Sequence, residues 1–294
     1  MGIALSLDVS HGGRNVPYGG GVVISRGKKR QFSTRVALSI LFAGLAIFLS
    51  LLALASEARA QSGTAPSANA VSTDRHGWKP PITDRVVAHV LFNQLEGRTD
   101  GASPDLRWDG EGWIGTDMNR LWIKSEGTLH GSSLSDGDQE LLYDRPIPRL
   151  RYLDAQVGIR EDLDSSANRT WGAIGIEGLA PSFFQIEPTF YFRDGGHVAG
   201  KITASYDLRI TQRLVAQPEL EMNFYSKPDP ARGLGTGMTD LDTGIRLRYE
   251  IRRKVAPYVG LAYTDQYGST ASYSHRSGDS VSNPRFIFGI RVWH

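Results

Sequence analysis

Apolar and polar residues alternate along most of the chain after residue 84, and the clearest run spans residues 240–252. In that run the odd positions are mostly apolar and the even positions are mostly charged. A period of two is the pattern of a β-strand whose two faces meet different surroundings. Twelve runs of this kind occur, and no segment after residue 84 shows a convincing helical period, so the sequence predicts an all-β protein. The predicted strands lie at about 86–98, 105–116, 119–129, 138–146, 150–161, 169–179, 183–192, 198–210, 213–226, 239–252, 255–268 and 284–293.

The length of the connection after a predicted strand depends on whether that strand is even-numbered or odd-numbered in the chain. Those after even-numbered strands are short, at 117–118, 147–149, 180–182, 211–212 and 253–254, whereas several after odd-numbered strands are long and polar, notably 131–137, 227–238 and 269–283. Transmembrane barrels have short turns at the periplasmic end and longer loops outside. The predicted strands also reach the ~9–11 residues that a tilted strand needs to cross a bilayer. We therefore predict an antiparallel transmembrane β-barrel of about 12 strands, with both termini in the periplasm and lipid around its outer surface.

The charged positions of the alternating runs would face the interior of such a barrel. A small barrel is largely filled by side chains, so a packed salt-bridge network is favoured over a weak cation path. The predicted inward-facing polar residues are Lys124, Glu126, Arg160, Glu187, Lys201, Glu219, Glu221, Asp240, Asp242, Arg246, Arg248 and Glu250.

The first sixty residues have a different character. A basic segment at 26–35 precedes an uninterrupted apolar run at 36–55, and Ala58 and Ala60 supply small residues at the positions that a signal peptidase reads. We predict cleavage after Ala60, with a retained membrane anchor as the alternative, because twenty apolar residues could span a bilayer. The expected organisation is an N-terminal extension with signal peptide (1–60), a disordered periplasmic tail rich in Ser, Ala, Thr and Pro (61–84), and the barrel (85–294).

The composition of the chain excludes several kinds of functional site. The chain lacks cysteine, which excludes disulfides, thiolate metal sites and cysteine nucleophiles. Of its 33 basic and 31 acidic residues, 7 and 2 lie within residues 1–60, which leaves 26 and 29 for the remainder, a net charge of −3. Nothing in that balance indicates a nucleic-acid partner.

Histidine and methionine are the side chains that could hold a soft metal ion. His89 lies on the first predicted strand, whose inner face the pattern leaves unassigned, and no two candidates have ligand spacing. A solvated or interfacial side chain is the favoured interpretation for each. The weak metal-ligand candidates are His76, His89, His130, His197 and Met118. Catalytic motifs are absent, so no catalytic residue is assigned. A hydrolase site at the barrel rim is the minor alternative, built from His130, Ser132 and Asp136 or from His275 and Asp279.

Several long motifs, in order, resemble one known family. WIGTDMNRLWIKSEG (113–127) is similar to the signature hairpin of the copper resistance protein B family of outer-membrane proteins. The similarity continues through ELLYDR (140–145), QVGIRED (156–162), RTWGAIGIEGLAP (169–181), YDLRITQRL (206–214), RLRYEIRRKVAPYVG (246–260) and FGIRVW (288–293). The resemblance implies an outer-membrane barrel in copper tolerance, with a copper ion as its ligand and a periplasmic multicopper oxidase as a partner.

The chain also departs from that family. Many members carry a Met- and His-rich N-terminal segment thought to bind copper, whereas residues 61–84 hold only His76 and no methionine. The closing strand suits recognition by the outer-membrane barrel assembly machinery, although His294 follows the aromatic residue that usually ends such proteins. We expect a barrel that binds copper or limits its passage. A non-specific structural or small-solute barrel is the first alternative and the rim hydrolase the second.

The signal-peptide prediction has a direct test. N-terminal sequencing of the mature protein should give Gln61 as its first residue, because the peptidase site ends at Ala60. A mature chain that begins upstream of Gln61 would contradict cleavage at this position and favour the retained anchor.

Overall fold

The structure is a computed structural model that describes residues 85–100, 104–131, 133–150, 152–163, 168–252 and 254–294. The predicted signal peptide with Ala58 and Ala60, the tail with His76, and Ser132 lie outside the described residues.

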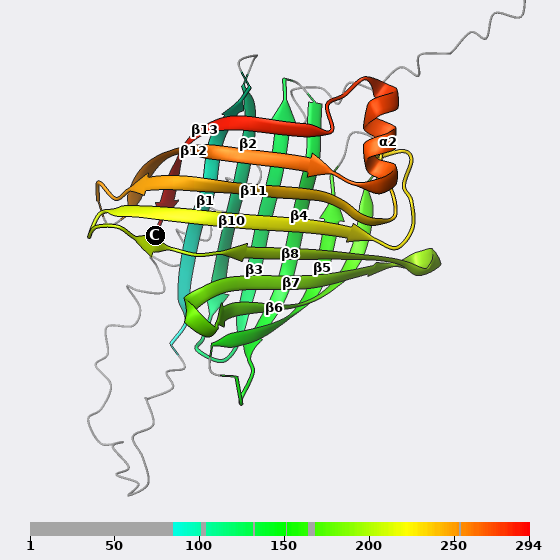
Figure 1. The fold of residues 1–294 in the computed structure, drawn as a ribbon. Helices are drawn as coiled ribbons and strands as arrows, with labels where there is room; N and C mark the ends of the chain where they lie inside the picture. Colours follow the sequence, from blue (N-terminus) through cyan, green and yellow to red (C-terminus); the bar gives the residue numbers. More distant parts are fainter. Residues whose placement is uncertain (1–84, 101–103, 132, 151, 164–167, 253) are drawn as a thin grey trace, which may run out of the picture.

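The described chain is built almost entirely of β-strands (Figure 1). The strands are β1 (Val87–Thr99), β2 (Asp105–Gly115), β3 (Arg120–His130), β4 (Ser133–Pro146), β5 (Leu153–Asp162), β6 (Arg169–Ala180), β7 (Phe184–Arg193), β8 (His197–Ser205), β9 (Leu208–Arg209), β10 (Leu214–Tyr225), β11 (Gly237–Tyr249), β12 (Val255–Gln266) and β13 (Ser282–Trp293). Short 3-10 turns, η1 (Pro181–Phe183) and η2 (Asp194–Gly196), join β6 to β7 and β7 to β8. The predicted strand positions are thus confirmed to within a few residues for nearly every strand.

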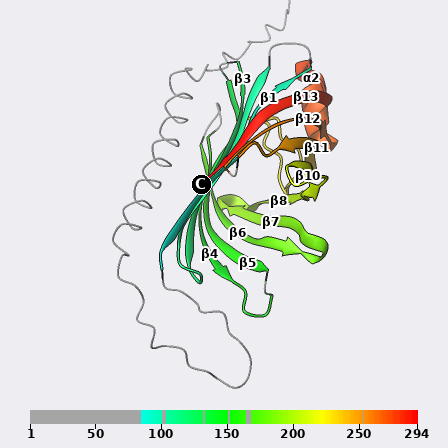
Figure 2. The same cartoon turned by 90° about the vertical axis from the view of Figure 1, so that its left-hand side faces the viewer.

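The sheet closes on itself. Each strand pairs antiparallel with its neighbours in the chain, and β1 completes the circle by pairing with β13, as Leu91 with Trp293 and Thr99 with Phe286. β8 and the two-residue β9 both pair with β10, so they form one interrupted strand where the sequence predicted a continuous one at 198–210. The result is a closed twelve-strand barrel. Figure 2 shows the curved wall from the side.

The two faces of the wall differ as the alternation predicts. Ile174 and Val259, on the outer face, are 53% and 52% exposed, whereas Asp162 and Arg246, on the inner face, are 0% and 3% exposed. A closed barrel satisfies every strand's backbone hydrogen bonds within the wall, which is what hydrocarbon demands. The apolar outer face is therefore suited to lipid, and the ionic residues line an enclosed interior.

An irregularity in β1 explains why its inner face could not be assigned from sequence. The register with β2 shifts between Phe92 and Gln94, which is a β-bulge. As a consequence Asn93 and Gln94, although consecutive, both line the interior. The bulge moves the inward positions from odd numbers to even ones, and so Glu96 and Arg98 also point inward.

The long-loop end of the barrel differs from the prediction in two places. The prediction of a loop at 131–137 is wrong, because most of this segment belongs to a strand. β4 begins at Ser133, and His130 pairs directly with Ser133. The polar side chains there do not prevent backbone pairing, and buried Leu134 anchors this part of β4. The predicted loop 269–283 contains a ten-residue helix, α2 (Gly268–Ser277), which ends at Gly278 with a left-handed φ of 84°. Its serine-rich sequence lacks an apolar stripe, so a helical period was not visible.

The helix α2 lies against the long-loop end of the strands, close to β11 and β12 (Figure 1). No helix in the described part of the chain is both long and apolar enough to cross a membrane.

A charge placed on the outer face tests whether that face meets lipid. Ile174→Lys, near the middle of β6, should lower the free energy of unfolding in lipid vesicles by about 2–4 kcal/mol, because it places an ammonium group in hydrocarbon. The same change on a water-facing sheet would alter the free energy by less than about 0.5 kcal/mol. Denaturant titration of refolded protein measures the difference, and a near-neutral result would contradict a lipid-facing wall.

Candidate functional site: the charged interior of the barrel

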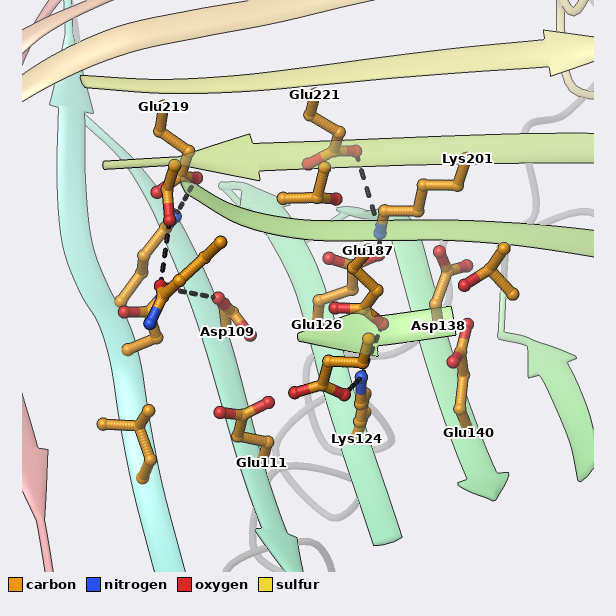
Figure 3. Close-up of a pocket in the computed structure, with 18 of the residues that line it drawn as sticks. Asp109, Glu111, Lys124, Glu126, Asp138, Glu140, Glu187, Lys201, Glu219 and Glu221 are labelled. Carbon is orange, nitrogen blue, oxygen red and sulfur yellow. Dashed lines mark hydrogen bonds and ion pairs between the residues drawn. The ribbon is translucent and has the colours of Figure 1, made fainter. Parts of the chain in front are cut away.

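Ion pairs cross the interior from wall to wall. Arg107 on β2 contacts Glu221 on β10 at 2.9 Å, and Lys201 on β8 contacts Glu126 on β3. These strands lie nearly opposite each other in the order of the sheet, so their side chains meet in the middle of the barrel. Figure 3 shows the Lys201 side chain reaching toward the carboxylates. The interior is therefore bridged rather than an open, wide channel.

Glu96 is the centre of the first ionic cluster. Its carboxylate accepts hydrogen bonds from Arg98 Nε at 2.7 Å, from Arg246 Nε at 3.0 Å and from the Tyr258 hydroxyl at 2.9 Å. The Glu96 side chain is fully buried, and Arg246 also contacts Glu219 at 3.1 Å. A buried carboxylate needs several donors of this kind, since an unpaired one would be strongly destabilising.

Lys124 on β3 is the centre of the second cluster. Its ammonium group contacts Glu187 on β7 at 2.5 Å and Glu177 on β6 at 2.8 Å. Gln156 donates a hydrogen bond to the same Glu177 carboxylate at 2.6 Å. One positive charge is thus shared between two carboxylates.

The third cluster lies toward the long-loop end, around Arg160 on β5. Its guanidinium contacts Asp138 and Asp162, each at 2.7 Å, and lies over the Tyr191 ring at 4.5 Å. Arg232, from the loop between β10 and β11, contacts the same Asp162 at 2.8 Å. All of these charged side chains are almost completely buried.

A cavity of about 300 Å³ remains among these clusters. Nine carboxylate residues but only four basic ones line it, so its lining is acidic. The acidic residues are Asp109, Glu111, Glu126, Asp138, Glu140, Glu177, Glu187, Glu219 and Glu221, and the basic residues are Arg107, Lys124, Lys201 and Arg291. In Figure 3 Asp109 and Glu111 lie on one side of this space, with Asp138 and Glu140 on the other.

The structure brings most of the predicted inward residues together. Six of them line the cavity: Lys124, Glu126, Glu187, Lys201, Glu219 and Glu221. Arg160, Asp242, Arg246 and Arg248 take part in interior ion pairs. Asp240 accepts a hydrogen bond from Asn223 at 2.9 Å. Glu250 lies just beyond the end of β11, 3.9 Å from Arg248 and partly exposed.

The described histidine and methionine candidates are scattered. His89 lies on β1 beside the Trp113 ring, at a centroid distance of 6.3 Å. His130 ends β3, and its Nδ1 contacts Asp105 at 2.8 Å. His197 begins β8, and Met118 lies in the turn between β2 and β3.

The carboxylates near the two rim-hydrolase histidines have other partners. The Asp105 carboxylate bound to His130 is shared with Arg285, at 2.7 Å. His275 lies on α2, whereas the Asp279 carboxylate accepts its hydrogen bond from the Ser277 hydroxyl. The side chain of Asp136 lies outside the described residues.

Several interior residues were missed from sequence. Arg107, Asp109 and Glu111 were detectable, because they alternate on β2 in the same way as the predicted residues on β3. Glu96 and Arg98 were hidden by the β1 bulge, and Arg232 could not be found because it sits on a loop rather than on a strand.

A tight metal site needs several suitable donor side chains around one point. Among the residues that the structure describes, no three His, Cys, Asp or Glu side chains come together as a group that could hold a metal ion. The donors that line the cavity are carboxylate oxygens, which suit hard ions and Cu(II) better than Cu(I). The described interior therefore does not fit a tight Cu(I) centre.

An antiparallel barrel that is apolar outside and ionic inside is an outer-membrane β-barrel. A family model described as copper resistance protein B precursor matches residues 86–294. The chain is 38% identical over 204 residues to the copper resistance protein B of Escherichia coli, covering 69% of this chain and 68% of that protein. It is 34% identical over 244 residues to a copper resistance protein B homolog of Pseudomonas syringae pv. tomato, covering 81% and 82%. The chain belongs to the copper resistance protein B family, which gives it a role in copper resistance at the outer membrane.

Solved structures resemble the chain only distantly. A NanC porin structure covers 70% of this chain and 99% of its own, with a TM-score of 0.44 and 10% identity. A similarity of this size carries no information about function.

Removing the central carboxylate tests the first cluster. Glu96→Ala should lower the free energy of unfolding by about 3–5 kcal/mol, because it leaves the buried Arg98 and Arg246 guanidiniums without their shared partner. Glu250→Ala is the matched control. Its carboxylate is partly exposed and 3.9 Å from Arg248, so its loss should cost less than about 1 kcal/mol. Equal effects of the two substitutions in vesicle unfolding would contradict the assigned importance of Glu96.

Proposed function

We propose that the protein supports copper tolerance as an outer-membrane barrel whose charge-bridged interior restricts the passage of copper ions. The observation that supports this is the pair of contacts that cross the interior, Arg107 with Glu221 and Lys201 with Glu126. A hydrated cation that entered from either end would have to displace these ion pairs to pass. Charged side chains inside a pore influence which ions move through it and how quickly.

The acidic cavity favours loose retention of copper over tight binding. Four of its nine carboxylates are paired with Arg107, Lys124 or Lys201, so a copper ion must compete with these resident cations. The four are Glu126, Glu177, Glu187 and Glu221. We expect exchangeable Cu(II) in this cavity, because hard oxygen donors discriminate poorly for Cu(I). This is a weaker form of copper binding than a dedicated centre would give.

The orientation and partners are part of the same proposal. β1 begins and β13 ends at the short-turn end of the barrel, and we place this end in the periplasm, as expected for outer-membrane barrels. The periplasmic multicopper oxidase implied by the family resemblance would then act on copper that the barrel has not excluded. The alternating outer face of β13, with Phe286 and Phe288 exposed, suits recognition by the barrel assembly machinery.

We assign no enzymatic activity. One of the two histidines of the rim-hydrolase alternative, His130, contacts Asp105, which also contacts Arg285. The non-specific barrel remains the principal alternative, and copper dependence separates it from the proposed function.

The test combines cells and vesicles. Deleting the gene should raise copper sensitivity, and the Arg107→Ala/Glu221→Ala variant should restore less tolerance than the wild type because it removes one bridge across the interior. Vesicles that contain this variant should also admit Cu(II) faster, as a copper-quenched fluorophore inside them would report. Arg193→Ala/Asp194→Ala is the control, since this 3.6 Å pair lies at the barrel end with Asp194 almost fully exposed. If deletion leaves copper sensitivity unchanged, the non-specific barrel is favoured instead.

A further inference from the structure

The loop at residues 226–236, between β10 and β11, has a fixed shape of its own. Its backbone closes into a small bridge, in which Asp229 N donates to Leu234 O at 2.9 Å and Leu234 N donates to Asp229 O at 3.0 Å. Gly233, with a φ of 72°, allows the chain to turn between them. We call residues 226–236 the mouth loop, because they lie at the long-loop end of the barrel.

The first attachment of the mouth loop is deeply buried. Arg232 Nη1 contacts Asp162 Oδ2 on β5 at 2.8 Å, and the two side chains are only 5% and 0% exposed. Asp162 also accepts hydrogen bonds from Arg160 Nε at 2.7 Å and from Trp171 Nε1 at 2.9 Å. In the order of the sheet β5 lies four strands from β10 and five from β11, so this contact carries the loop across the mouth.

The second attachment of the mouth loop is a bidentate ion pair. Arg169, the first residue of β6, donates from Nε to Asp229 Oδ2 at 2.8 Å and from Nη2 to Asp229 Oδ1 at 3.0 Å. Paired contacts of this kind fix orientation as well as distance. The mouth loop is therefore held at two points to the wall that faces its own strands.

The third attachment joins the mouth loop to α2. Gly235 N donates to the Thr270 hydroxyl at 2.8 Å, and Thr270 is buried. A Cβ atom at position 235 would lie 2.6 Å from the Thr270 backbone nitrogen, so the loop and the helix are packed too closely for any side chain there.

We propose that the mouth loop is a latch that controls entry to the acidic cavity from the long-loop end, with the Arg232–Asp162 and Arg169–Asp229 ion pairs holding it closed. This inference rests on the proposed function, because it assumes that ions move through the interior. Just inside the latch, Asp138 and Glu140 line the cavity. An ion that enters would thus meet the Arg232 and Arg160 guanidiniums before it reaches these carboxylates.

Because its ion pairs are buried, the latch should have only a closed and a fully open state. A guanidinium as buried as that of Arg232 is stable only with its carboxylate partner, so a partly opened loop would leave charges unpaired. The latch should therefore remain closed until a single coordinated movement releases both the Asp162 and the Arg169 contacts.

The test measures access to the cavity without using copper. The chain has no cysteine, so Thr189→Cys places a single thiol on the cavity wall. Thr189 is a suitable reporter, because it is 3% exposed and its hydroxyl has no hydrogen-bond partner among the residues that the structure describes. The labelling rate of this thiol by a small charged methanethiosulfonate reagent is followed on refolded protein in detergent micelles.

Removing either attachment should make the coordinated opening more frequent, because fewer contacts then stabilise the closed loop. Arg232→Gln and Arg169→Gln should each raise the labelling rate at least about tenfold, which corresponds to about 1.4 kcal/mol less stabilisation of the closed loop. The exchange Arg169→Asp/Asp229→Arg keeps the ion pair and should return the rate toward that of the wild type. Arg276→Gln is the matched control, because this exposed arginine on α2 donates only to its own helix, at Ser272 O.

The outcomes separate this inference from the proposed function. Equal labelling of wild type and Arg232→Gln, in protein shown to be folded by its heat-dependent gel migration, would overturn the latch. If Arg232→Gln does not fold, Asp229→Asn tests the less buried attachment in its place. Faster labelling with unchanged copper tolerance and Cu(II) entry would keep the latch and contradict the proposed role in copper passage.

Discussion

The pairing of β1 with β13 is the contact on which the rest of the molecule depends. An open sheet in hydrocarbon would expose two edges of unpaired backbone groups, each destabilising by several kcal/mol. Closure removes both edges and at the same time encloses a space that lipid cannot reach. Charged side chains such as Glu96 and Arg246 are stable in that enclosed space, because they pair with each other there and do not face lipid.

The interior shows how a small barrel accommodates many charges. Each cluster joins groups from strands far apart in the sequence, as when Glu96 contacts Arg246 or Lys124 contacts Glu187. Such pairs contribute little net stability compared with an apolar core. Removing one partner is nevertheless strongly destabilising, because it leaves the other charge buried and unpaired. We therefore expect their arrangement to favour a single packing of the interior more than it strengthens the fold.

The family membership and the chemistry of the interior bear on copper in different ways. The family membership establishes a role in copper resistance. The chemistry of the interior is that of an acidic, oxygen-lined cavity bridged by Arg107, Lys124 and Lys201. We propose that such an interior acts on ions through charge and access rather than through soft ligands. The mouth loop contributes to the same arrangement, since it places Arg232 close to Arg160 of β5, with Asp162 bound to both.

The sequence by itself determined the strands and the two faces of the wall, because alternation with period two depends only on local backbone geometry. It therefore predicted inward-facing positions for Lys124, Glu126 and Lys201, which line the cavity in the structure. It could not assign the inner face of β1, where one bulge moves Gln94, Glu96 and Arg98 to the inside, nor find α2, whose sequence has no apolar stripe. Only the tertiary structure decided which charges meet, because closure and strand tilt bring Arg107 to Glu221 and Arg232 to Asp162 across more than sixty residues of chain.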